Sequence, residues 1–199
     1  MTATGASVAF IACGAVAQDT AELVKRHGWR ADVHGISSDL HMVPLEIAPT
    51  VEQKLKDLLP RYERVIVVYG DCGTGGRLDE VLARYPAARP AGVHCFQWYA
   101  GDLFERFTDD IGIYFLTDWL VQNWDRAVIG GLGLDRFPWL KETYFGNITR
   151  ILFVRQHPDE EREARAREIA TWMDRPLEIH DPGIEPLDAL LTPLMEETA

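Results

Sequence analysis

The stretch Arg64–Tyr69, with the sequence RVIVVY, constrains the fold more than any other part of the chain. It is continuous, apolar and rich in β-branched residues, as is typical of a strand buried on both faces of a parallel sheet. The glycine-rich turn Gly70–Gly76 (GDCGTGG) follows directly, and a helix is expected from Leu78 to Arg84. A buried strand that leads through a tight turn into a helix is half of a β-α-β unit, so a parallel sheet is expected.

Strand-sized and helix-sized segments alternate along the 199 residues. Further strands are expected at Ser7–Ala12, Arg30–Ile36, Arg89–His94, Gly112–Leu116, Ile151–Gln156 and Leu177–His180. Further helices are expected at Ala17–Gly28, Ala48–Tyr62, Ala100–Thr108, after Thr117-Asp118, and at Pro158–Met173. The glycine-rich, aromatic stretch Gly130–Tyr144 is interpreted as a loop with a short helix. This order predicts a single α/β domain over residues 1–199, Rossmann-like, with a mostly parallel sheet and helices on both faces, or a variant with repeated βα sub-lobes.

The net charge of the chain limits the kinds of partner that it is expected to bind. The chain has 31 acidic and 20 basic residues and a net charge of -11, which argues against nucleic acid and against an anionic membrane surface. Its apolar runs are far shorter than the ~20 residues of a membrane span, and no signal-like leader is apparent, so a cytoplasmic location is expected. A small molecule, which could be anionic, or another protein is the expected partner, and the aromatic content makes a homodimer plausible.

Each of the three cysteines follows an expected strand: Cys13 the run SVAFIA, Cys72 the run RVIVVY, and Cys95 the run AGVH. Ligands of open parallel sheets bind outside the carboxyl ends of the strands, so neighbouring strands would bring the thiols together. The helices after Cys13 and Cys72 are expected to lower the thiol pKa values. Thiolates bind zinc and iron–sulfur clusters, and three of them leave one metal position open. The alternative is three separate core cysteines.

Other candidate residues flank these cysteines. The candidates for acid–base work or for outer contacts of a metal site are Asp71, His41 and His94. The candidates for holding an anionic group of a substrate are Gly73, Thr74, Gly75 and Gly76. The alternatives are an ordinary strand-to-helix turn for the glycine loop, and histidines without a functional role.

Several segments carry a resemblance: Ile11–Gly14, Leu40-His41 with Pro44, Tyr69–Gly76 with Leu78-Asp79, His94-Cys95, Ala100-Gly101, Phe115–Asp118, Gly131–Asp135 and Tyr144–Asn147. They resemble the DUF1638 family of bacterial and archaeal proteins, from about residue 7 to about residue 180. Phe96-Gln97 stands where that family has Tyr-Glu, which argues against a carboxylate role there. The resemblance implies the α/β fold, the three-cysteine site and a link to corrinoid-dependent methyl-transfer proteins of one-carbon metabolism. The layout also resembles quinolinate synthases and thiouracil desulfidases, in which three lone cysteines hold a four-iron cluster.

The leading hypothesis is a metal-dependent small-molecule enzyme, a lyase, hydrolase or transferase. Cys13, Cys72 and Cys95 would hold a [4Fe-4S] cluster whose open iron acts as a Lewis acid. A first alternative is a zinc-thiolate site used in methyl or sulfur transfer. A second is a non-enzymatic binding or accessory protein with structural cysteines.

Overall fold

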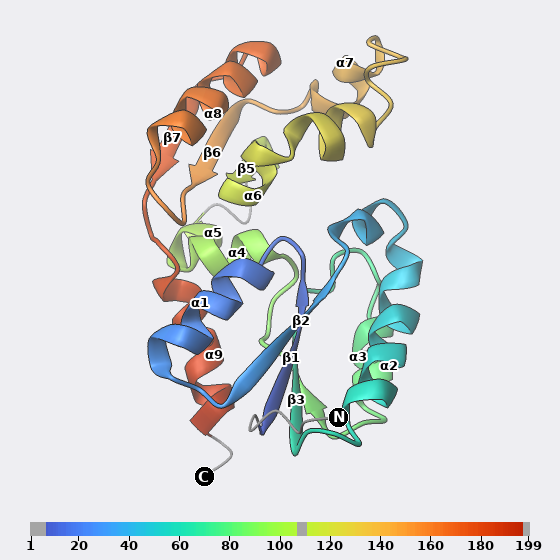
Figure 1. Cartoon of the computed structure of the whole chain (residues 1–199). Helices are drawn as coiled ribbons and strands as arrows, with labels where there is room; N and C mark the ends of the chain where they lie inside the picture. The colour runs from blue at the N-terminus through green and yellow to red at the C-terminus, as the bar shows by residue number, and fades with distance from the viewer. Residues whose placement is uncertain (1–6, 107–110, 197–199) are drawn as a thin grey trace. The chain divides into compact units, whose positions relative to one another are not determined.

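The computed structural model describes residues 7–106 and 111–196, and these form two compact units (Figure 1). Unit 1 comprises Met1–Cys95 and Asp188–Ala199, and unit 2 comprises Phe96–Leu187. Each unit has its own parallel sheet, which confirms the expected Rossmann-like α/β class. The sequence predicted one domain over residues 1–199, whereas the contacts divide the described chain into these two units, so each is described by itself.

The sheet of unit 1 has the strand order β2-β1-β3-β4, and all three pairings are parallel. Its strands are β1 (Val8–Cys13), β2 (Ala31–Ile36), β3 (Arg64–Val68) and β4 (Ala87–Ala88). Every residue of β1 is buried, as the continuous apolar pattern requires. The chain passes from β1 to β2 on one side, whereas β3 and β4 lie on the other side of β1. This reversal is a topological switch point at the carboxyl ends of β1 and β3, where open α/β sheets bind ligands.

Helices cover both faces of this sheet (Figure 1). Helices α1 (Ala17–His27) and α9 (Glu185–Glu196) lie on one face, and α2 (Ile47–Leu58) and α3 (Arg77–Leu82) lie on the other. Helix α1 ends at Gly28, whose φ of 65° closes the last turn in the left-handed conformation. Two short 3-10 helices, η1 (Ser38–Met42) and η2 (Pro44–Glu46), precede α2, and α4 (Cys95–Ala100) begins at the end of unit 1.

Unit 2 has a second parallel sheet, with the order β5-β6-β7. The bounds of its elements are β5 (Ile113–Thr117), β6 (Arg150–Val154), β7 (Leu177–His180), α5 (Asp102–Arg106), α6 (Asp118–Gln122), η3 (Asp125–Gly130), α7 (Leu140–Phe145) and α8 (Glu160–Met173). The Thr117 side chain accepts a hydrogen bond from the Leu120 amide, which confirms the predicted cap of α6. A core around Trp124 and Phe153 holds these elements together.

The prediction of a strand at Arg89–His94 is wrong. Only Ala87–Ala88 pairs with β3, and the chain then forms an irregular loop. Pro90 has no amide hydrogen for a ladder, and Gly92 has a φ of 135°. The expected helix Ala100–Thr108 is α4 followed by α5, and its residues 107 and 108 lie outside the described part of the chain.

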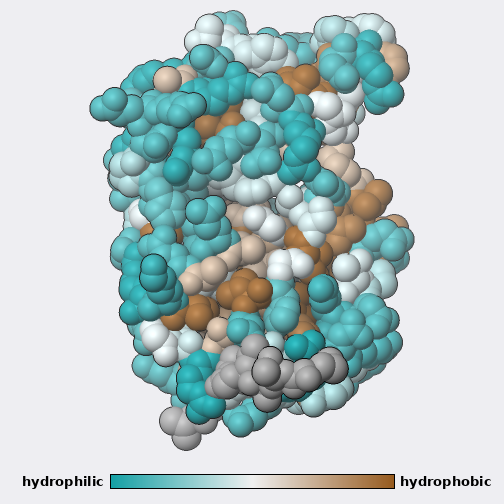
Figure 2. Space-filling view, viewed as in Figure 1, coloured by the Kyte–Doolittle hydropathy of each residue, from teal (hydrophilic) through white to brown (hydrophobic). Residues whose placement is uncertain are grey.

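The surface of the visible face is mostly polar, with scattered apolar groups (Figure 2). The large apolar side chains exposed in unit 1 are Met42, Val43, Leu45 and Val93. Within residues 7–106 and 111–196, none of the helices has the length and apolar character needed to cross a bilayer.

Candidate functional site

The three cysteines lie at the carboxyl edge of the unit 1 sheet. Cys13 is the last residue of β1, Cys72 lies in the turn after β3, and Cys95 is the first residue of α4. The strands β1 and β3 are direct neighbours, paired up to Ala12 and Val68. Cys13 and the turn with Cys72 therefore flank the topological switch point.

The loop that leads to Cys95 is attached to the Cys72 turn through the backbone. The Cys72 amide donates a hydrogen bond to the Val93 carbonyl oxygen at 2.9 Å. A Cβ atom on Gly70 would lie 2.6 Å from that same oxygen, so only glycine permits this approach. Cys72 itself has a φ of 48°, which is unusual for a residue with a side chain and is found most often at functional sites. The turn therefore sets where both Cys72 and Cys95 stand.

Asp71 organises this turn. Its carboxylate accepts hydrogen bonds from the Thr74 hydroxyl, from the Gly75 amide at 3.1 Å and from the Gly76 amide at 2.9 Å. These bonds, that of Thr74 above all, lower the pKa of Asp71. The amides expected to receive an anionic ligand are thus directed at a carboxylate of the turn itself. Gly73 packs against Pro44 of η2, since a Cβ atom on this glycine would lie 3.4 Å from the proline Cβ.

The pKa values of the Cys13 and Cys72 thiols are higher than the sequence indicated. We expected helix macrodipoles to lower the pKa values of Cys13 and Cys72, but burial raises both, that of Cys72 to about 12. The expectation was wrong because Cys72 precedes a helix of only 6 residues and Cys13 is 4% exposed. Backbone amides partly oppose burial: the Ala15 amide donates to the Cys13 sulfur at 3.5 Å.

A buried tyrosine, Tyr69, lies between the end of β3 and the turn that carries Cys72. Tyr69 is fully buried, and its hydroxyl has no hydrogen-bond partner among the residues that the structure describes. Burial, and then the charges that Cys13, Cys72 and Cys95 would carry as thiolates, raise the pKa of Tyr69. The sequence did not single out Tyr69, because it reads as the last apolar residue of the strand.

The two candidate histidines lie at the same edge. The His41 ring stacks on the Tyr69 ring, with centroids 5.7 Å apart, and its Nδ1 lies 2.8 Å from the Ser38 carbonyl oxygen. Burial lowers the pKa of His94, and the charges of Asp71 and His41 act on it as well. The structure thus brings His41, His94 and Asp71 into one electrostatic neighbourhood beside the thiols.

The spacing of these groups matters for any metal. Among the described residues, no group of three or more His, Cys, Asp or Glu side chains is arranged so that it could hold a metal ion as it stands. A single tetrahedral zinc would need sulfurs about 3.8 Å apart, from Zn–S bonds of about 2.3 Å. In a four-iron cluster each cysteine binds a different iron, so the sulfurs stand further apart.

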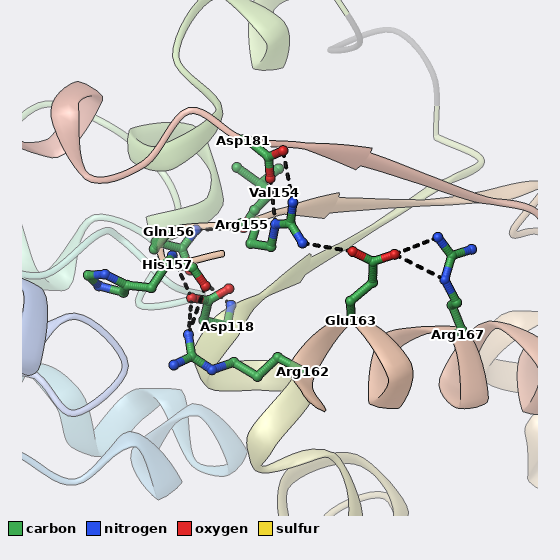
Figure 3. A network of polar contacts seen from close by, with 9 residues as sticks. All are labelled: Asp118, Val154, Arg155, Gln156, His157, Arg162, Glu163, Arg167 and Asp181. Carbon is green, nitrogen blue, oxygen red and sulfur yellow. Dashed lines mark hydrogen bonds and ion pairs between the residues drawn. The ribbon is translucent and has the colours of Figure 1, made fainter. Parts of the chain in front are cut away.

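Unit 2 has a polar network at the carboxyl edge of its own sheet (Figure 3). Asp118, directly after β5, accepts hydrogen bonds from the His157 amide and from Arg162 of α8. The Gln156 side chain accepts a hydrogen bond from the Asp118 amide and donates one to the Val154 carbonyl oxygen. It therefore connects the end of β6 to the start of α6. Burial raises the pKa of Asp118 against the effects of these partners. The network joins the ends of β5 and β6 to α6 and α8. The polar residues at this edge therefore have a structural role, which is to hold these elements together.

Comparison with known proteins identifies the family and no activity. A family described as protein of unknown function, DUF1638, matches residues 36–191. Cys72 and Cys95 lie inside the matched range, and Cys13 precedes it. Neither a curated protein nor a solved structure matches the chain. Since the match covers well over half of the sequence, the chain belongs to the DUF1638 family.

Proposed function

We propose that this protein is a metal-dependent small-molecule enzyme in which Cys13, Cys72 and Cys95 hold a [4Fe-4S] cluster with one open iron. The observation that carries the proposal is the placement of the three cysteines at the switch point: Cys13 ends β1, Cys72 lies in the turn after the neighbouring β3, and the loop to Cys95 is hydrogen-bonded to that turn.

A four-iron cluster suits cysteines that come from three separate chain segments, because each cysteine then binds a different iron. The Ala15 amide donates to the Cys13 sulfur and supports the same assignment, because such bonds stabilise cluster thiolates.

The open iron would supply Lewis-acid chemistry for a non-redox lyase, hydrolase or transferase reaction. His41 and His94 stand where they can exchange protons with a substrate at this edge, since both lie beside the thiols and His94 is only partly buried. We assign Asp71, Thr74 and the amides of Gly75 and Gly76 to holding the turn, because they bond to one another. The exposed side chains of Met42 and Val43 offer a substrate an apolar rim.

The test is anaerobic expression with iron supplied, followed by metal analysis and the visible spectrum. The variant is Cys72→Ser, and the matched control is Val43→Ser, an exposed residue of the neighbouring η1–η2 segment that holds no thiol. We expect a brown wild type with about four irons, the same in Val43→Ser, and colour and iron lost in Cys72→Ser with the circular dichroism unchanged.

Other outcomes separate the alternatives. About one zinc per chain, lost in Cys72→Ser, would replace the cluster by a zinc-thiolate site suited to methyl or sulfur transfer, for which corrinoid proteins would be the partners to test. A colourless wild type without iron or zinc would overturn the metal proposal and leave a small-molecule-binding protein with structural cysteines.

A further inference from the structure

We propose that Tyr69 is a built-in hydrogen-bond donor for the cysteine site: its phenol donates to the Cys13 sulfur once that sulfur is a metal-bound thiolate. Tyr69 would be a positioning residue that acts through Cys13. The inference rests on the proposed function, because only a loaded site gives the phenol an anionic acceptor.

The sheet register places the two residues side by side. β1 and β3 pair in parallel, with Ala12 opposite Val68. The next position on each chain is Cys13 and Tyr69. Opposed residues of a parallel pair direct their side chains to the same face, so the phenol and the thiol share one side of the sheet end.

The position of the Tyr69 hydroxyl is energetically unfavourable in the metal-free protein. It is buried, and within the described ranges it makes no hydrogen bond of acceptable geometry. A buried hydroxyl without a partner destabilises a fold, whereas a phenylalanine of the same shape would not. Buried polar groups without a partner are retained at sites where another state of the molecule, such as a ligand-bound state, provides the hydrogen bond.

The surroundings hold the phenol in this position. The His41 ring stacks on the Tyr69 ring at an interplanar angle of 18°, and the Tyr69 side chain is 0% exposed. A fixed ring cannot turn its hydroxyl to solvent. The donor is therefore preorganised toward the sulfurs before any metal arrives.

Tyr62 offers a matched control at the other end of the same strand. It precedes β3, as Tyr69 follows it, and it is 6% exposed. Its hydroxyl donates to the Asp32 carboxylate at 2.7 Å and lies 3.2 Å from His34. Tyr62→Phe removes a hydroxyl that has partners, and Tyr69→Phe removes one that has none.

The first comparison uses the metal-free full chain. We expect Tyr62→Phe to lower the denaturation midpoint, because Asp32 loses its donor, and Tyr69→Phe to leave it unchanged or raise it. A loss in Tyr69→Phe as large as that in Tyr62→Phe would show that the hydroxyl already serves the metal-free fold, and would overturn the inference.

The second comparison uses chains loaded anaerobically with ferrous iron and sulfide. We expect Tyr69→Phe to hold iron at least about 10-fold less well against a chelator, the usual effect of removing a partner of a metal ligand. We also expect its reduction potential to fall, since a donor to a cluster sulfur favours the more negative, reduced form. Tyr62→Phe should match wild type in both measurements.

The two proposals fail in different ways. If wild type loads and Tyr69→Phe matches it in iron retention and in potential, the role of Tyr69 is wrong and the metal site stands. If wild type takes up neither iron nor zinc, the metal site is wrong, and the donor role of Tyr69 is overturned with it.

Discussion

Gly70 shows how one residue without a side chain sets the geometry of the candidate site. It lies directly before Asp71 and Cys72, and the backbone of the Cys95 loop passes against its Cα. The distances from its Cβ position to the Val93 carbonyl oxygen and carbon are 2.6 and 2.9 Å. Because these contacts are to backbone, no rotamer change can relieve them.

We predict that Gly70→Ala destabilises the protein by about 1–3 kcal/mol, the usual cost of overpacking, and reduces the loading of the proposed metal site because the Cys95 loop must move. Gly35→Ala is the control, since nothing lies within 4 Å of its Cβ position and its φ is not left-handed. Denaturant unfolding and iron content measure both effects. Equal stability of the two variants would mean that the loop yields without cost.

At this scale the sequence predicted the places of Cys13 and Cys72 but not the chemistry around them, and Cys95, which was expected after a strand, follows an irregular loop and begins α4. Cys13 and Cys72 could be placed because a residue after a buried parallel strand must lie at the carboxyl edge. The pKa directions could not, since burial depends on segments distant in sequence. Nor could the pattern tell whether the amides of Gly75 and Gly76 face a ligand or the Asp71 carboxylate.

At the scale of the elements, the Arg89 side chain organises the loop between β4 and α4. Arg89 makes two bonds to the Asp79 carboxylate of α3, at 2.6 and 2.9 Å. Its remaining nitrogen donates to the carbonyl oxygens of Pro90 and Gly92. The guanidinium thus fixes an irregular segment to a helix, and with it the approach to Cys95.

This pair predicts a pH dependence. The hydrogen bonds from Arg89 lower the pKa of Asp79 below its unfolded value near 3.9. The ion pair therefore stabilises the fold above about pH 4, and its contribution is lost as the pH falls through the lower, folded pKa. The contribution is at most about 1 kcal/mol because the Asp79 side chain is 56% exposed.

The measurement is the free energy of unfolding of Asp79→Asn relative to wild type between about pH 3 and pH 7. We expect a difference that is constant near neutral pH and shrinks as the solution becomes acidic. Glu80→Gln, an exposed neighbour in α3 that leaves the pair intact, should show no such trend. A difference that grows on acidification would contradict the lowered pKa of Asp79.

The elements with clear periodicity were predicted well: β3, α1 and β7 lie within a residue or two of their expected bounds. The Arg89–His94 strand failed because the segment forms a loop whose order comes from the contact of Arg89 with Asp79, which local propensity cannot reveal. Helix α9 was not expected, since Pro186 and Pro193 within its bounds weaken the helical pattern.

On the scale of the whole molecule, the two units have separate cores. Leu191 of α9 is fully buried in unit 1, although it lies near the end of the sequence. Phe153 of β6 is fully buried in the core of unit 2. A cavity at either residue should therefore weaken mainly its own unit.

We predict that Leu191→Ala costs about 2–5 kcal/mol and Phe153→Ala about 3–5 kcal/mol, with effects confined to one unit each. Hydrogen exchange read by mass spectrometry measures this. Leu191→Ala should speed exchange in β1 and β3, and Phe153→Ala in β5 and β6. Equal acceleration in all four strands after either change would show that the units unfold as one body.

The return of the chain to unit 1 at Asp188 has a consequence for biosynthesis. All three cysteines are synthesised before unit 2, and the part of α9 that completes their unit is synthesised after it. At about 5–20 residues per second, the interval between Cys95 and Asp188 is roughly 5–20 s. During that time the thiols belong to an unfinished nascent chain, exposed to oxidants and to stray metals. Loading of the proposed metal site is therefore expected only after α9 has been synthesised and has completed unit 1.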